Sequence, residues 1–290
     1  MKKIKDPLEA FLGHLNSIYV EPVENIIEID GIINNEIDLQ DKQKDYVLSG
    51  SINEDLKISG KSVALKNITI ENSVTNIEAT GSVILNDANI VGEFPKEKGN
   101  AIASINNQDD ITIKDCTITP SLAYNGIESG LAKDAAPKSV LIQIINFDGK
   151  FNNNVISIFG TADNAVVNIN NCHFADCSNM IRISNKNNTK LMINIRNCKI
   201  DNWNLADAYA GMIICQDYTS GSAEAAAKNN LFAPEKVTIN IENVIGPNGK
   251  IEKAELSTIC GTKDSNQLVY IFDKDVVAYD ETRYPKINIK

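Results

Sequence analysis

The chain of 290 residues is 43% hydrophobic, only 6% aromatic and 23% charged, with a formal net charge of -10 and a pI of about 4.8. Nucleic acids and anionic membranes attract basic surfaces, so this acidic balance argues against either of them as a partner. No run of about 18 apolar residues occurs, and we therefore expect no membrane insertion through a helix.

The first 45 residues differ in pattern from the rest of the chain. Asp6-Pro7 predicts the start of a short helix, with Asp as the N-cap and Pro at the first helical position, and the helix ends near Asn16. An apolar stripe at helical spacing follows this start: Leu8, Phe11, Leu12 and Leu15. Residues 19–45 are strand-like fragments among acidic residues. We predict that residues 1–45 form an arm or cap, which either covers the end of the following domain or docks on another subunit through the stripe.

The basic residues at the start of the chain are not followed by an apolar region. We therefore expect no secretory signal and folding in a cytoplasm. In such a compartment the six cysteines are expected to be reduced and mostly buried.

An eight-residue motif recurs along the middle of the chain, with the order apolar, polar, apolar, polar, Asn or Asp, Cys, polar, apolar. The copies that keep the cysteine are 111–118, 167–174 and 193–200, and looser copies are 63–70, 83–90, 142–149 and 239–246. Recurrence at a period of about two dozen residues predicts stacked structural units. The last two copies start 46 residues apart, which we interpret as two periods with one coil that has lost its signature.

Most units also contain a second short β-branched run, such as 155–159 or 180–185. Two or three short strands per period predict one turn of a parallel β-helix. Asn or Asp at the fifth position suits a left-handed corner, where stacked side chains can bond to one another. Cys116, Cys172 and Cys198 at the sixth position are predicted to form a buried column.

Two long insertions, 129–138 and 218–234, follow the second strand of their units and are expected to leave the same edge of the stack. Loops on a rigid scaffold often carry contacts, so the second insertion is a candidate partner surface through Lys228, Leu231 and Phe232. Plain solvated loops remain the alternative. Residues 271–290 are predicted to form a C-terminal cap or tail.

Over residues 46–270 this repeat resembles that of the right-handed parallel β-helix proteins, the pectin-lyase-like superfold. The resemblance lies in the repeat pattern and in no active-site motif. It implies an all-β, single-stranded right-handed parallel β-helix, a solenoid with a short N-terminal helix or arm and capped ends. The superfold includes polysaccharide lyases and hydrolases and also many structural proteins of tailed bacteriophages, so the fold does not decide the function.

The search for catalytic or metal-binding patterns gives no candidate. Only two histidines occur, His14 in the predicted helix and His173 beside Cys172. Neighbouring strand residues face opposite sides, so Cys172 and His173 are not expected to share a metal ion. The Asn-Thr-Asp, Gly-His-Gly and Arg-Ile-Lys set of polygalacturonase-like enzymes is absent. We predict no catalytic residue, no cofactor and no metal site.

Two functions remain as hypotheses. The first is a non-enzymatic structural protein of a large assembly, by the resemblance a tailed-phage virion component such as a capsid decoration, head fibre or tail protein. Its partners would be other capsid or tail subunits and copies of itself, and it would reside in the virion after folding in the host cytoplasm. The second is a polysaccharide-binding or polysaccharide-cleaving β-helix with a host glycan as its partner. This alternative places acidic residues near Asp176 and Asp201–Asp207 at the site.

Overall fold

The computed structural model describes residues 26–34, 36–71, 75–79, 82–91, 103–107, 111–118, 125–129, 139–149, 154–159, 164–175, 177, 179–184, 190–202, 212–215, 234–252, 269–271, 282 and 285–290. These residues contain strands and no helix, so the prediction of an all-β protein is confirmed for this part of the chain. No helix able to cross a bilayer is therefore found among them.

The strands form two sheets, and all of the pairs but one are parallel. The main path of the large sheet is, in spatial order, β1 (Ile26–Ile29), β4 (Asp45–Ile52), β6 (Ser62–Glu71), β8 (Val83–Val91), β10 (Ile111–Ile118), β12 (Ser139–Gly149), β14 (Asn164–Asn170), β17 (Lys190–Arg196), β20 (Val237–Glu242) and β24 (Lys286–Ile289). Short strands beside this path are β2 (Ile32–Ile33), β15 (His173–Phe174), β18 (Lys199–Ile200), β21 (Ile245–Gly246) and β22 (Gly249–Lys250). The second sheet contains β3 (Ile37–Leu39), β5 (Leu56–Gly60), β7 (Thr75–Ala79), β9 (Ala103–Asn107), β11 (Asn125–Ser129), β13 (Asn154–Phe159), β16 (Asn179–Ser184), β19 (Ile213–Cys215) and β23 (Val269–Ile271).

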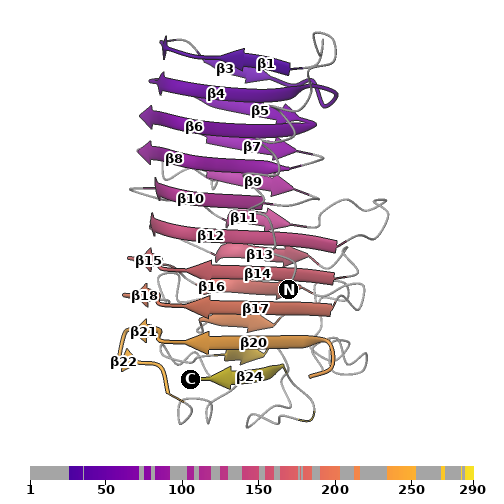
Figure 1. Cartoon of the computed structure of the whole chain (residues 1–290), viewed down its shortest axis with the longest axis vertical. Helices are drawn as coiled ribbons and strands as arrows, with labels where there is room; N and C mark the ends of the chain where they lie inside the picture. The colour runs from indigo at the N-terminus through magenta and orange to yellow at the C-terminus, as the bar shows by residue number, and fades with distance from the viewer. Residues whose placement is uncertain are drawn as a thin grey trace, which may run out of the picture.

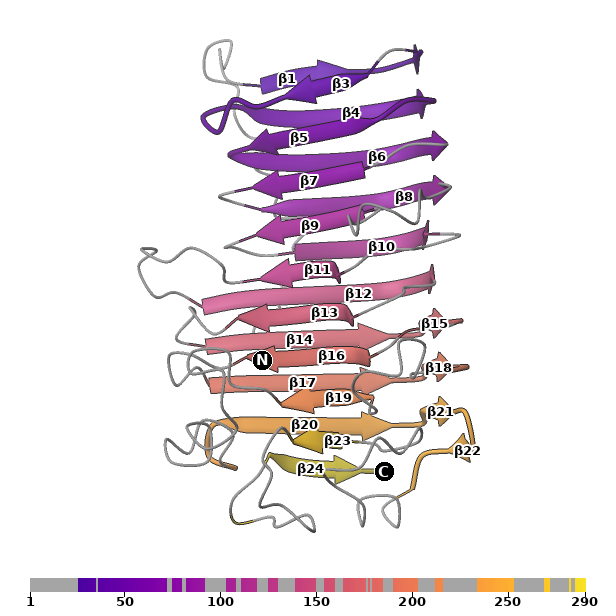
Figure 2. The same ribbon diagram turned by 180° about the vertical axis from the view of Figure 1, so that it is seen from behind.

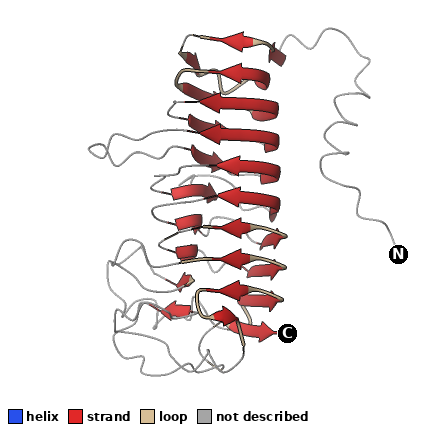
Figure 3. Cartoon of the chain, turned by 90° about the vertical axis from the view of Figure 1, so that its left-hand side faces the viewer, coloured by secondary structure: helices blue, strands red, loops and turns tan. Residues whose placement is uncertain are grey.

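Successive segments of the chain alternate between the two sheets. Figures 1 and 2 show long strands of the large sheet and shorter strands of the second sheet alternating down the stack and running in opposite directions. In the side view of Figure 3 the strands lie one above another along a single axis. One strand of the large sheet and the next strand of the second sheet are called a coil below. The arrangement is compatible with a β-solenoid.

The predicted motif sets the register of the large sheet. The first residues of neighbouring copies pair directly: Val63 with Val83, Val83 with Ile111, Ile111 with Ile142, Ile142 with Val167, Val167 with Ile193, and Ile193 with Ile239. A shift of one residue would turn every buried side chain outward, so the alternation of apolar and polar residues fixes this register.

The interpretation of the 46-residue gap as two coils is wrong. Strand β17 pairs directly with β20, and in the second sheet β19 lies between β16 and β23. The gap is therefore a single coil with long insertions. Because the entropy of loop closure grows only slowly with length, such insertions are tolerated without disturbing the register.

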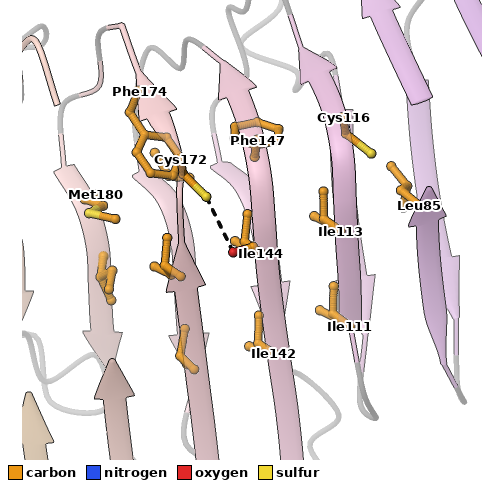
Figure 4. Packing of buried hydrophobic residues seen from close by; sticks show 14 of the residues in the cluster. Leu85, Ile111, Ile113, Cys116, Ile142, Ile144, Phe147, Cys172, Phe174 and Met180 are labelled. Atoms are coloured by element: carbon orange, nitrogen blue, oxygen red, sulfur yellow. Dashed lines mark hydrogen bonds between the residues drawn. The ribbon is translucent and has the colours of Figure 1, made fainter. Parts of the chain in front are cut away.

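The core lies between the sheets and repeats from coil to coil. The first and third positions of every copy are apolar and almost fully buried, as Ile142 and Ile144 illustrate. Figure 4 shows these side chains in rows across neighbouring strands, continued by Phe147 and Cys172. Each row buries apolar surface against the rows beside it, at roughly 25 cal/mol per Å² removed from water.

Strands extend beyond the predicted limits of the repeat. Strands β1 and β2 pair with β4, and β3 pairs with β5, so residues 26–39 belong to the two sheets. At the other end β24 pairs with β20 and continues the large sheet. The proposed divisions at residues 45 and 270, and the roles of the two ends, stay predictions. The predicted helix of residues 6–16 lies outside the described residues.

Candidate functional site: a polar groove along the asparagine corner

Each copy of the motif bends sharply at its fifth residue. The residues at this position have a positive φ between 47° and 55°: Asn67, Asp87, Asp115, Asn146, Asn171, Asn197 and Asn243. Among the described non-glycine residues no others have a positive φ. The predicted left-handed corner is therefore confirmed in all seven copies. Asn and Asp adopt this conformation more readily than other side chains, because their short polar groups can bond locally.

The corner side chains bond from coil to coil, as predicted. Each amide nitrogen donates toward the N-terminal neighbour: Asn146 Nδ2 to Asp115 Oδ1 at 2.6 Å, Asn171 Nδ2 to Asn146 Oδ1 at 2.7 Å, Asn197 Nδ2 to Asn170 Oδ1 at 3.3 Å, and Asn243 Nδ2 to Asn197 Oδ1 at 2.9 Å. One step departs from the column, because Asn197 bonds to Asn170 rather than to Asn171. This corner ladder ties five neighbouring coils together.

A second ladder crosses the outer face of the large sheet at the second motif position. Its bonds run from Asn194 to Asn168 at 2.8 Å, from Asn240 to Asn194 at 2.8 Å and from Asn288 to Asn240 at 2.7 Å. Strand β24 therefore repeats the pattern of the preceding coils although its motif copy is incomplete. This face ladder was not predicted, but the shared second-position Asn of three copies is its signal in the sequence.

The cysteine column lies just inside the corner. Cys116, Cys172 and Cys198 are 2–3% exposed and form no disulfide, which confirms the predicted buried column. Each thiol also donates to the carbonyl oxygen two residues earlier: from Cys116 to Lys114 at 3.0 Å, from Cys172 to Asn170 at 3.2 Å and from Cys198 to Arg196 at 3.0 Å. Burial raises the pKa of Cys116 to about 11, so this thiol stays protonated and unreactive at neutral pH.

A shallow groove of about 800 Å³ follows the outer side of this corner. It runs from the coil of Asp115 to the coil of Asn243, and the corner ladder forms part of its lining. The seventh motif residues line it as well: Thr117, Asp148, His173, Lys199 and Ile245. The sixth motif residues Cys116, Phe147, Cys172 and Cys198 complete the lining, so the groove is built from three adjacent columns of the repeat.

A charged cluster of four side chains lies at the middle of the groove, and three of them line it. The His173 ring contacts two carboxylates, with Nδ1 3.4 Å from Asp148 Oδ2 and Nε2 2.8 Å from Asp201 Oδ2. Lys199 Nζ lies 2.6 Å from the other carboxylate oxygen of Asp201. The four side chains come from three successive coils and are partly exposed to solvent. We call Asp148, His173, Lys199 and Asp201 the histidine cluster.

The cluster favours the charged forms of His173 and Asp201. Burial alone would lower the pKa of His173, but its hydrogen bonds with Asp201 and Asp148 outweigh this effect and raise the pKa above the ordinary value. Lys199, followed by His173, lowers the pKa of Asp201. The cluster therefore contains two cations and two carboxylates when His173 is protonated.

This arrangement suits binding better than catalysis. Both ring nitrogens of His173 face carboxylates, so neither nitrogen is free to accept a proton from a substrate, as a general base must. A glycosidase acid needs a raised carboxyl pKa, whereas that of Asp201 is lowered. Cys172 is buried whereas the His173 side chain is partly exposed, as expected from strand alternation. Within the described residues no group of three or more His, Cys, Asp or Glu side chains is arranged so that it could hold a metal ion.

The sequence-derived contact residues are not located by this structure. Leu8, Phe11, Leu12, Leu15, Lys228, Leu231 and Phe232 lie outside the described residues, as do Asp176 and Asp207 of the polysaccharide alternative. Asp201 is not among the residues that line the groove, but it contacts His173 and Lys199, which do line it. Sequence reasoning did not bring Asp148 and Lys199 together with His173. Both share the seventh motif position with His173, so the repeat register could have brought them together.

Comparison with protein-family models, with curated proteins and with solved structures finds no significant match to this chain.

Proposed function

We propose that this chain is a non-enzymatic structural protein that serves as a rigid β-helical platform in a large protein assembly. The observation that carries the proposal is the continuous backbone pairing of the large sheet from β1 to β24, which two side-chain ladders reinforce over part of its length. Such a stack lacks a hinge between coils, because bending it would break several hydrogen bonds in each layer at once.

We further propose that the fold is a single-stranded right-handed parallel β-helix of the pectin-lyase-like kind. Two arguments support this fold, the resemblance of the repeat and the usual handedness of crossovers between parallel strands. Each connection that leaves the large sheet returns to it as the next parallel strand, and crossovers between parallel strands of one sheet are right-handed in about 98% of cases.

The assembly that fits best is a tailed-phage virion, with this chain as a capsid decoration, head fibre or tail protein. The resemblance of the repeat to phage β-helices supports this choice, and so does the net charge of -10, which disfavours adhesion to nucleic acid during assembly. In this proposal the apolar stripe Leu8, Phe11, Leu12 and Leu15 and the insertion residues Lys228, Leu231 and Phe232 contact other subunits.

Binding of a host glycan is the second candidate function, and the polar groove favours it. Asn146, Asn171 and Asn243 line the groove together with Asp148 and Lys199, and such amides and charged groups can hydrogen-bond sugar hydroxyls. The electrostatics of the histidine cluster favour binding without cleavage in this groove.

The purified chain incubated with a panel of bacterial surface polysaccharides tests the proposal. Product size and newly formed reducing ends or unsaturated sugars would be measured for the natural sequence and for Asp201→Asn. We expect no product with either protein. Cleavage by the natural sequence that is lost in Asp201→Asn would contradict a non-enzymatic platform, whereas retention of one glycan without cleavage would support the second candidate.

A further inference from the structure

We propose that Asp148, His173 and Asp201 form a pH-sensitive clamp across three neighbouring coils, and that loss of the His173 proton loosens this edge of the groove. The clamp is a regulatory device of the fold and does not depend on the proposed function of the whole chain.

The clamp lies where neighbouring coils share only a few residues of backbone pairing. After the corner, β15 pairs with β12 and with β18 over two residues each, and β18 pairs with β21 at Lys199 and Ile245 alone. The main strands β14 and β17 are by contrast paired over seven residues. Few backbone hydrogen bonds hold the short strands β15, β18 and β21 to one another. Side-chain contacts therefore contribute a larger share of the local stability of these strands.

The charged groups around His173 come from both sides of its coil. Asp148 of β12 faces one ring nitrogen, and Asp201, which follows β18, faces the other. Lys199 of β18 pairs with Asp201, while the groove neighbours Thr117 of β10 and Ile245 of β21 carry no charge. With the imidazolium present, the two cations balance the two carboxylates.

A neutral imidazole cannot keep both contacts. It has one N–H donor and one acceptor nitrogen, so one carboxylate would face a lone pair in place of a proton. The ring can then hold one neighbouring coil but not both. The loss of one charge also leaves a net charge of -1 on the cluster.

The pH range follows from the direction of the shift. The pKa of His173 is raised above its ordinary value of 6.5, so the folded state binds the proton more tightly than the unfolded state. The clamp's contribution to folded-state stability is fully present below about pH 6.5. This contribution is lost as the pH rises through the higher pKa that His173 has in the folded state. The clamp is therefore closed in mild acid and opens on the alkaline side.

Amide hydrogen exchange at residue resolution tests the clamp in the full-length protein. The reporters are the amides of Lys199, Asp201 and Ile245, which donate to Cys172, Phe174 and Cys198 at 2.9, 3.0 and 2.9 Å. Leu191, which donates to Lys236 at 2.7 Å in the main part of the sheet, is the internal reference. Protection would be measured between pH 6 and pH 9 and corrected for the intrinsic rise of exchange with pH.

We expect protection of the reporters to fall by up to about tenfold per unit of pKa shift as His173 deprotonates, while Leu191 stays constant. His173→Gln keeps a polar side chain that does not titrate, so its reporters should have no such pH dependence. His14→Gln is the matched control and should behave like the natural sequence. Equal pH dependence in His173→Gln and the natural protein, or flat protection in both, would overturn the clamp. Protection of Leu191 establishes in each variant that the stack is folded.

Discussion

The corner asparagine meets two requirements with one side chain. It accepts the left-handed backbone conformation, which costs most other residues roughly 1–2 kcal/mol, and its amide bonds to the neighbouring coil. Glycine would meet the first requirement only. Ser and Thr would meet both requirements less well than Asn does. This explains why Asn or Asp recurs at the fifth position while the flanking polar positions vary.

Asn171 offers a direct test of this double role. We expect Asn171→Ala to lower the free energy of unfolding by about 2–3 kcal/mol, because backbone strain adds to the loss of one ladder bond of about 1 kcal/mol. Asn171→Gly relieves the strain and should cost less than Asn171→Ala. Chemical denaturation of the three proteins measures both differences. Equal stability of the alanine and glycine variants would contradict a strained corner.

The cysteine at the sixth position is a small apolar residue with one weak donor. Its thiol reaches a carbonyl oxygen near the sharp corner, while its burial places it among isoleucines of adjacent coils (Figure 4). Ile68 and Val244 occupy the same column and are equally buried, so the column requires an apolar side chain of moderate size rather than sulfur itself.

Cys172 distinguishes a buried column from a surface one. Cys172→Asp should destabilise the protein by on the order of several kcal/mol, because it places an unpaired charge in the core. Cys172→Val reproduces the residue found at position 244 and should change stability by less than about 1.5 kcal/mol. Thermal unfolding compares the two variants. A Cys172→Asp protein as stable as Cys172→Val would mean that the column is exposed to water.

At the scale of elements, the first two coils turn their corners differently from the others. Gly31 and Gly50, with φ of 116° and 97°, replace the corner Asn, and the register shifts between Leu48 and Gly50. The Gly31 carbonyl accepts a bond from the amide of Ser51 at 2.9 Å. A Cβ atom on Gly50 would overlap the backbone of Gly31, so the two glycines allow a close approach of neighbouring coils.

Gly50→Ala should therefore be more destabilising than an ordinary substitution at a positive φ. Gly249 has a similar φ of 114° but has open space around its Cα, which makes Gly249→Ala the matched control. We expect Gly50→Ala to exceed the cost of Gly249→Ala by about 1–3 kcal/mol, the usual cost of overpacking. Equilibrium unfolding in urea measures the difference, and equal costs would argue against close packing of the first two corners.

These corners explain which part of the fold the sequence could predict. In all coils with an Asn corner the buried residues have the same spacing along the chain. The strand register, the buried column and the corner ladder of these coils could therefore be predicted from the motif. The coils of β1 and β4 lack the Asn, and the shifted register between β4 and β6 breaks the spacing of the motif. As a result, residues 26–39 were described only as strand-like fragments before the repeat, and their pairing with β4 and β5 was not predicted. The single coil between β17 and β20 was missed for a related reason, because sequence spacing does not distinguish an insertion from a lost repeat.

The histidine cluster was missed for a different reason, although the motif register aligns Asp148, His173 and Lys199. His173 was correctly placed on an outward strand position, but its partners lie 25 and 28 residues away in the chain. They become neighbours only after the coil lengths are known. Side-chain contacts across coils depend on rotamers as well as on register, and a sequence pattern does not specify these.

The described coils form a rod-like stack (Figure 3). Neighbouring coils are spaced by about 4.8 Å, so the main path of the large sheet spans roughly 45 Å along the stack axis (Figure 1). Core-facing residues at its ends, such as Ile27, Ile29 and Ile289, are only partly buried. Open ends of stacked sheets favour pairing with another chain or a cap, so the ends are where contacts of the platform should concentrate.

The N-terminal stripe should decide how this rod associates. We expect the full-length chain to form a defined oligomer and a version starting at Ile26 to be a smaller, folded species, because removing residues 1–25 leaves all described strands in place. Multi-angle light scattering measures both masses, and circular dichroism checks the fold. Leu12→Glu in the full-length chain is the matched control and should mimic the truncation. Identical masses for all three proteins would contradict a docking role for the stripe.

Mass spectrometry of purified particles from the source of this chain tests the platform proposal most directly. Virus-like particles would be isolated by density gradient, washed at high salt and quantified for this chain relative to the major capsid and tail subunits. The proposal predicts a fixed copy number per particle that survives the wash. Absence of the chain from the particles, with all of it recovered in the particle-free fraction, would contradict its role as a structural component of the assembly.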